Sequence, residues 1–194
     1  MEVIKTAYKG GNSDLIKEVC KLYLKNGDVV YDVTYGKGVF WKKVDLSSYD
    51  FKGSDLMGGV DFSSLPYSDD SCNVLVLDPP YMHGGASVKD SINKCYRNKN
   101  TSHESVIRLY AKGILEASRV LVKGGLIWVK CQDEIESGKQ RLSHCEIISL
   151  LEIFGFSIVD IFLLVSNSTP TMRNNYQNTA RKNHSYLLIA KFRR

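Results

Sequence analysis

The chain has 194 residues, 43% of them hydrophobic and 24% charged, which suits one globular domain over residues 1–194 and leaves little length for a second. No apolar run approaches the roughly 18–20 residues that cross a bilayer, and the N-terminus lacks the apolar stretch of a signal peptide, so we expect a soluble, cytoplasmic protein. The net charge of +5 is local, because residues 166–194 hold six Lys or Arg and no acid, and such a patch suggests a polyanionic partner.

Helix and strand patterns alternate from the beginning of the chain. Apolar residues at spacings of three and four predict a helix over Asp14–Lys25, with Ser13 as its N-cap. A first strand is predicted at Asp28–Val33, followed by a glycine-rich turn and a short helical or turn segment from Val39. A second short strand is expected near Tyr49–Leu56.

The second half continues this alternation. Its predicted elements are the strand Asn73–Leu77, the helix Ser105–Leu121 stopped by Lys123-Gly124-Gly125, the strand Leu126–Cys131, the helix Ser143–Phe154 before Gly155, and the strands Ile158–Val165 and Tyr186–Phe192. Strands separated by helices indicate an α/β fold, with a mostly parallel sheet covered by helices on both faces. The last two strands have no helix between them and are expected to form an antiparallel hairpin.

The five cysteines are odd in number and scattered, with no CxxC pair and no His at ligand spacing. This pattern favours reduced thiols and predicts neither a disulfide framework nor a metal site.

A glycine-rich stretch, "DVTYGKGVF", follows the first predicted strand. Gly36 and Gly38 permit positive φ and let a ligand approach the backbone, and Asp32 could accept hydrogen bonds from loop N–H groups or from an ammonium group. The stretch matches neither GxGxxG nor a Walker loop, so a tight turn without a ligand is an equal alternative on these residues alone.

Two acids downstream favour a nucleoside ligand. Asp55 lies about twenty residues past the glycines, at the end of the second strand, from where a carboxylate can reach ribose hydroxyls. Asp61 could bond the amino group of an adenine while Phe62 packs on its ring. Taken separately, each acid could be a surface residue or a helix cap, but their order along the chain fits one site.

The strand Asn73–Leu77 is followed directly by Asp78, Pro79, Pro80 and Tyr81. Because prolines donate no backbone hydrogen bond and favour extended geometry before them, they stop the strand and leave acceptors at its end. Asp78 and the carbonyl of Pro79 suit the amino group of a nucleobase, whose delocalised lone pair such bonds would localise. Tyr81 could stack on the base, and stacking of about 1–3 kcal/mol offsets much of the cost of extruding it from a duplex.

These stretches, in this order, resemble a known family. "DVTYGKGVF", "SDL", "DFSSLP" and "VLDPPY" are similar to motifs I to IV of the S-adenosylmethionine-dependent amino-methyltransferases, in particular the N6-adenine DNA methyltransferases, and "AYKGGNSDLIKEV" is similar to their motif X. The resemblance implies the Rossmann-like class I methyltransferase fold, a seven-stranded sheet with its last strand antiparallel. It further implies transfer of a methyl group from S-adenosyl-L-methionine to the N6 amine of adenine in DNA.

Carried over by position, the resemblance assigns roles to fifteen residues. The catalytic set is Asp78, Pro79, Pro80 and Tyr81, and the cofactor set is Lys9, Gly10, Asp32, Tyr35, Gly36, Lys37, Gly38, Phe40, Asp55, Asp61 and Phe62. Lys37 departs from the family's usual glycine pattern. Its charge is expected to face solvent or the cofactor carboxylate.

We expect no separate target-recognition domain, because only about forty residues separate Gly38 from Asp78 and the residues after Lys130 are needed to complete the sheet. We therefore expect the polar stretch 82–105, with Gly84-Gly85 as a hinge, to be a mobile loop that closes over the flipped base. A solvated loop that contacts nothing is the alternative. The candidate phosphate contacts are Lys94, Arg97 and Lys99 in this loop and Arg173, Arg181 and Lys182 in the C-terminal segment. We therefore expect low sequence specificity, unless a partner subunit or a homodimer provides the recognition of a target sequence.

Two rival functions are compatible with the same motifs. In related families, similar tetrapeptides bind adenine in RNA or the N2 amine of guanine in RNA. The resemblance favours DNA as the substrate, and methylation of RNA stays the alternative. The chain could also be a non-catalytic subunit of a methyltransferase pair, although its intact motifs argue against this.

Overall fold

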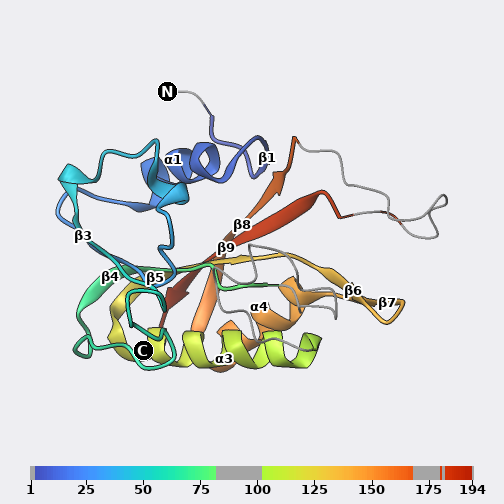
Figure 1. Ribbon diagram of the computed structural model, residues 1–194. Coiled ribbons are helices and arrows are strands. Elements are labelled where there is room, and N and C mark those ends of the chain that lie inside the picture. The colour runs from blue at the N-terminus through green and yellow to red at the C-terminus, as the bar shows by residue number, and fades with distance from the viewer. Residues whose placement is uncertain (1–2, 82–101, 168–179, 181, 194) are drawn as a thin grey trace.

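A computed structural model describes residues 3–81, 102–167, 180 and 182–193. Its centre is a seven-stranded sheet with the strand order β1-β8-β9-β5-β4-β2-β3 (Figure 1). The strands are β1 (Ala7–Lys9), β2 (Val29–Asp32), β3 (Asp50–Gly53), β4 (Cys72–Leu77), β5 (Leu121–Cys131), β8 (Phe156–Val165) and β9 (His184–Phe192). β9 runs antiparallel to both of its neighbours and the other pairs are parallel, which confirms the predicted sheet and its closing hairpin.

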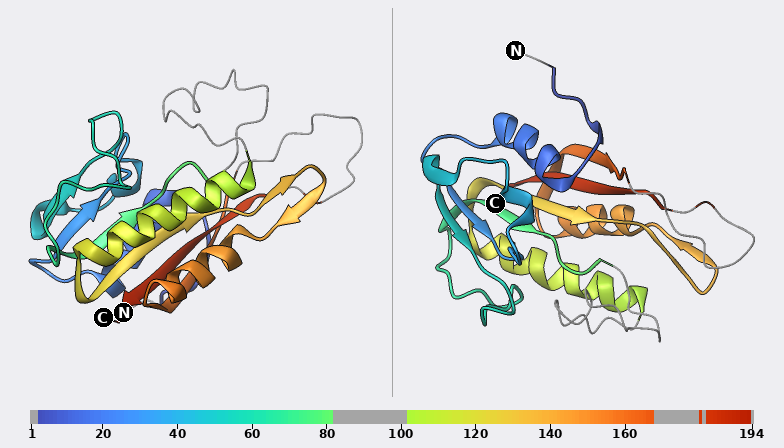
Figure 2. Two further views of the ribbon diagram at one scale, coloured as in Figure 1. Left: turned by 90° about the horizontal axis from the view of Figure 1, so that it is seen from below. Right: turned by 45° about the horizontal axis from the view of Figure 1, so that its top comes forward.

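Helices cover both faces of the sheet, as the alternation predicted (Figure 2). α1 (Asn12–Tyr23) lies on one face with the 3-10 turns η1 (Val39–Trp41) and η2 (Leu46–Ser48), and α3 (His103–Val120) and α4 (Ser143–Ile153) lie on the other. Because side chains alternate along a strand, each central strand contributes to two cores. In β4, Val74 and Val76 pack on the α1 side, whereas Leu75 and Leu77 pack on the side of α3 and α4.

Several element boundaries differ from those predicted. α1 starts at Asn12 with Gly11 as its N-cap residue, so Ser13 lies inside the helix. α3 starts at His103, because the Ser102 side chain accepts from the N–H of Ser105; the end of the predicted loop 82–105 is therefore helical. Lys123-Gly124-Gly125 does not stop this helix but lies inside β5, at an irregularity in its pairing with β4.

Three strands were not expected from the sequence. β1 has only three residues and is held by parallel pairing with β8. β6 (Glu134–Glu136) and β7 (Lys139–Arg141) form a hairpin beyond β5, joined by Ser137 at φ +49° and Gly138 at φ +78°. Two left-handed residues are typical of the two-residue turns that match strand twist.

Among the described residues, no helix is long and apolar enough to cross a membrane. That part of the chain also contains no group of three or more His, Cys, Asp or Glu placed to hold a metal ion.

Candidate functional site

The loops that follow β2 and β4 meet at the carboxyl end of the sheet, because these strands are hydrogen-bonded neighbours. Val33 donates its N–H to the carbonyl of Val76, which continues the pairing past the end of β2. The N–H of Asp78 then donates to the hydroxyl of Thr34 over 2.7 Å. The glycine loop and the Asp-Pro-Pro-Tyr segment are thus fixed to each other, as expected for parallel strands whose ends form a ligand site.

Asp32 ends β2 and is almost fully buried, with 2% of its surface exposed. Its Oδ1 accepts from the N–H of Thr34 over 3.0 Å and from the hydroxyl of the same residue over 3.2 Å. Its Oδ2 accepts from the indole N–H of Trp41 over 2.7 Å. Burial raises the pKa of Asp32 to about 7, although these hydrogen bonds stabilise the charged form. The loop N–H contact agrees with the sequence interpretation, and Trp41 was not anticipated.

Asp78 follows β4, and its Oδ1 is buried without a hydrogen-bond partner among the described residues. Burial raises the pKa of this carboxyl to about 6, and the positive charge of Lys130 acts against that rise. Pro79 and Pro80 provide no donors beside it. A buried carboxylate oxygen without a donor is unusual in a folded protein, and it is the acceptor that a bound amino group would need.

The glycine loop has the backbone that its sequence indicated. Gly36 and Gly38 adopt φ values of +52° and +65°, in the left-handed region. The Tyr35 side chain leaves no space for a Cβ at Gly38, where that atom would lie 2.5 Å from the Tyr35 hydroxyl. The same holds for Gly53 on β3, where a Cβ would lie 2.7 Å from the Tyr35 ring. Lys37 is exposed, and Phe40 is buried in the core beneath α1.

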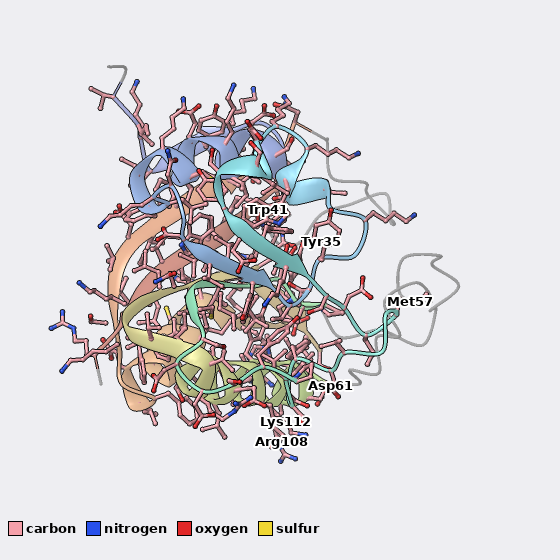
Figure 3. All side chains as sticks on the ribbon, turned by 90° about the vertical axis from the view of Figure 1, so that its left-hand side faces the viewer. Tyr35, Trp41, Met57, Asp61, Arg108 and Lys112 are labelled. Carbon is pink, nitrogen blue, oxygen red and sulfur yellow. The ribbon has the colours of Figure 1, made fainter. Side chains whose placement is uncertain are left out.

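Asp55 and Asp61 each accept hydrogen bonds from a residue two or three positions later, within the same turn. Asp55 accepts the N–H of Gly58 through Oδ1 over 2.7 Å, and Asp61 accepts both the N–H and the hydroxyl of Ser63 through Oδ1 over 2.8 Å. Phe62 packs on the α3 side, within 3.1 Å of the position of a Cβ on Gly113. In Figure 3, Asp61 lies between the loop that carries Met57 and the helix α3, which carries Arg108 and Lys112.

A cavity of about 360 Å³ lies beside the Asp-Pro-Pro-Tyr segment. It brings together three residues predicted from separate parts of the sequence, Gly10, Tyr81 and Lys182. The other lining residues are Gly11, Asn12, Lys130, Gln132, Leu164, Ser166, Asn183, His184 and Ser185. Oδ1 of Asn12 is buried and, within the described part of the chain, accepts no hydrogen bond, so the cavity wall holds an unused acceptor. Lys9 is exposed on β1 and does not line the cavity.

The residues that sequence reasoning missed are mainly those of the cavity wall. Lys130 carried a detectable signal, since a lysine interrupts the apolar run "LIWVKC" at the end of a buried strand. Thr34 and Ser185 carried none, because their roles depend on which strands become neighbours. The predicted phosphate contacts Lys94, Arg97, Lys99, Arg173 and Arg181 lie outside the described residues.

No protein-family model and no curated protein matches this sequence. Solved structures match over most of the chain. An S-adenosylmethionine-dependent methyltransferase from Methanosarcina mazei is 13% identical, with a TM-score of 0.53 over 90% of this chain and 97% of the other. A candidate methyltransferase from Bacillus halodurans is also 13% identical, with a TM-score of 0.53 over 92% and 99% of the two chains.

The [4+2]-cyclase SpnF is similar to the same degree, at 15% identity and a TM-score of 0.53 over 93% of this chain and 80% of the other. At such identities the likeness concerns the fold alone, and the fold does not fix the reaction. Together with the strand order and the antiparallel β9, these matches show that the chain has the Rossmann-like fold of the class I methyltransferases.

Proposed function

We propose that this protein transfers a methyl group from S-adenosyl-L-methionine to the exocyclic N6 amine of adenine in DNA. The observation that carries the proposal is the buried Oδ1 of Asp78, an acceptor at the end of β4 for which the described residues provide no donor. Two further features support it. Tyr81 lines the adjoining cavity, and the glycine loop is tied to Asp78 through Thr34.

The chemistry requires a poor nucleophile to be activated. In adenine the amine lone pair is delocalised into the ring, and a hydrogen bond from the amine to Oδ1 of Asp78 would localise it. When bound, the cofactor would supply an electrophilic methyl group to the amine nitrogen, which would lose a proton on accepting it. Because burial raises the pKa of Asp78 to about 6, its carboxylate is a stronger base than an exposed one and can accept that proton.

The residues present fit the cofactor. Gly36 and Gly38 adopt positive φ in the loop at the carboxyl end of β2, and Asn12 offers a buried acceptor next to Gly10. We assign the ribose to Asp55 and the cofactor adenine to Asp61 and Phe62. Lys9, Asp32, Tyr35, Lys37 and Phe40 complete the proposed cofactor set. The exposed position of Lys9 and the burial of Asp32 and Phe40 give these three less direct roles.

The nucleic acid would be held by basic residues around the cavity. Lys182 lines the cavity and is the proposed phosphate contact within the described residues. Phosphate contacts position a duplex without reading its sequence, so we expect low sequence specificity or a partner subunit that supplies it.

The test is the modified nucleoside itself. Purified protein is incubated with cofactor and either DNA or RNA, and the digested nucleosides are identified by mass spectrometry, with Asp78→Ala as the matched inactive control. N6-methyladenine in DNA supports the proposal. Exclusive labelling of RNA, on adenine or on guanine N2, overturns the choice of DNA, and product formation by the Asp78→Ala variant at the wild-type rate overturns the assignment of the site.

A further inference from the structure

Lys130 is a buried cation in the wall of the cavity. It is the penultimate residue of β5 and is 2% exposed. Its ammonium group donates to the hydroxyl of Ser185 on β9 over 2.5 Å and lies 5.8 Å from the centroid of the Tyr81 ring. Its backbone carbonyl accepts from the hydroxyl of Tyr110 on α3 over 2.7 Å. Both ends of the residue are therefore fixed.

The register of the sheet places Lys130 beside the catalytic tetrapeptide. Leu77 of β4 pairs with Val129 of β5, so Asp78 and Lys130 are the next residues along two neighbouring strands. A buried ammonium group is costly unless an opposite charge is near, and Ser185 is neutral. Burial lowers the pKa of Lys130, and the nearby carboxylate of Asp78 acts against that fall by stabilising the ammonium form. The charge of Lys130 in turn acts against the rise that burial causes in the pKa of Asp78.

We infer that Lys130 is a positioning residue of this active site, whose charge holds Asp78 as a carboxylate and whose ammonium group fixes the Tyr81 ring in the cavity wall. The inference rests on the proposed function for its catalytic consequence, but the effect on Asp78 belongs to the folded chain. A protonated Asp78 is a weaker hydrogen-bond acceptor for the amine and cannot take up its proton.

Within the described part of the chain, the other groups around Asp78 cannot replace Lys130. Asp32, at the end of β2, repels the charge of Asp78. Tyr81 after the strand, Tyr110 on α3 and Cys131 on β5 also interact electrostatically with Asp78, and as phenols and a thiol they carry no positive charge. Removing Lys130 would leave Asp78 in a buried site beside Asp32, so its pKa must rise.

The decisive experiment measures the carboxyl pKa of Asp78 directly, without substrate. Carbon-13 NMR titrations compare the full chain with the variants Lys130→Met, Lys130→Gln and Lys130→Arg. The variant Lys123→Met, which removes an exposed charge from the same strand, is the matched control. We expect the pKa of Asp78 to rise by about 1 unit in the Met and Gln variants and to stay near the wild-type value in the Arg and Lys123 variants.

Gln retains a donor for Ser185 and so preserves the fold if Met does not. An Asp78 pKa that is unchanged in a folded Met or Gln variant overturns the inference. Where the wild type methylates a nucleic acid, the acidic limb of its pH–rate profile should move upward by the same amount in Lys130→Met, but not when Asp78→Asn is also present. If the wild type methylates nothing, the proposed function fails while the NMR shift still decides the role of Lys130.

Discussion

Two aspartates at the ends of adjacent parallel strands have similar positions and different surroundings. Asp32 and Asp78 follow β2 and β4, and burial raises the pKa of both. Asp32 accepts three hydrogen bonds from Thr34 and Trp41, and so holds its loop together. Oδ1 of Asp78 is buried without a donor in the described structure. The hydrogen bonds of Asp32 fix the loop after β2, whereas the open acceptor of Asp78 is the one that the proposed amine would use.

The largest expected effect separates the two aspartates by activity. Replacing Asp78 with Ala removes the amine acceptor and should lower the methylation rate by about 10²–10³-fold, the usual cost of deleting one preorganised polar group. Asp78→Asn retains an Oδ1 acceptor and should lose less. Calorimetric titration of the cofactor checks that binding survives in both variants. A wild-type rate in Asp78→Ala would show that the open carboxylate is not the reacting group.

The second expected effect concerns stability at Asp32. Asp32→Ala leaves the indole N–H of Trp41 and the N–H of Thr34 buried without their acceptor, which should lower the free energy of unfolding by about 2–4 kcal/mol. Urea denaturation monitored by circular dichroism measures the loss. The matched control is Asp61→Ala, whose exposed carboxylate bonds only within its own turn and whose loss should cost about 1 kcal/mol or less. Equal losses in the two variants would contradict the structural role of Asp32.

The third expected effect is a pH dependence that only Asp78 should impose. Its pKa is raised to about 6, so the carboxylate is present above that pH and is lost as the pH falls through it. The methylation rate should therefore decline about tenfold per pH unit below 6, because one required group becomes protonated. Asp78→Asn has no titrating carboxyl at position 78 and should lose the acidic limb near pH 6, whereas a limb near pH 7 would belong to Asp32, whose pKa burial raises to about 7. An acidic limb that persists in Asp78→Asn would assign it to another group.

The sequence predicts features that depend on local contacts better than features that depend on contacts between distant residues. The strand ends and the positive φ values of Gly36 and Gly38 were predictable, because they depend on residues adjacent in the chain. The hydrogen bond of Trp41 to Asp32 and the meeting of Lys130 with Asp78 depend on side-chain direction and strand register, which no local pattern encodes.

Short segments were also hard to predict, because their structure depends on neighbours that are distant in the chain. β1 exists only because β8 pairs with it, and three residues with a half-buried tyrosine carry no strand signal. The composition predicts a helix stop at Gly124-Gly125, but in the structure Gly125 lies within β5. Close packing requires a glycine there, since a Cβ would lie 2.9 Å from the carbonyl of Val122. The roles of the cofactor and nucleic-acid residues remain predictions.

The smallest expected effect tests the connection between the two aspartates. The hydroxyl of Thr34 donates to Asp32 and accepts from the N–H of Asp78, so Thr34→Val removes both bonds at nearly constant volume. The N–H of Asp78 is then left unsatisfied, and we expect unfolding to become easier by about 1–2 kcal/mol. Thr34→Ser keeps the hydroxyl and should stay within about 1 kcal/mol of the wild type, which makes it the control. If the loops depend on this bridge, amide hydrogen exchange at Asp78 should accelerate in Thr34→Val and not in Thr34→Ser. Equal exchange in both variants would mean that the sheet alone holds the Asp-Pro-Pro-Tyr segment in place, and that Asp32 and Asp78 act independently.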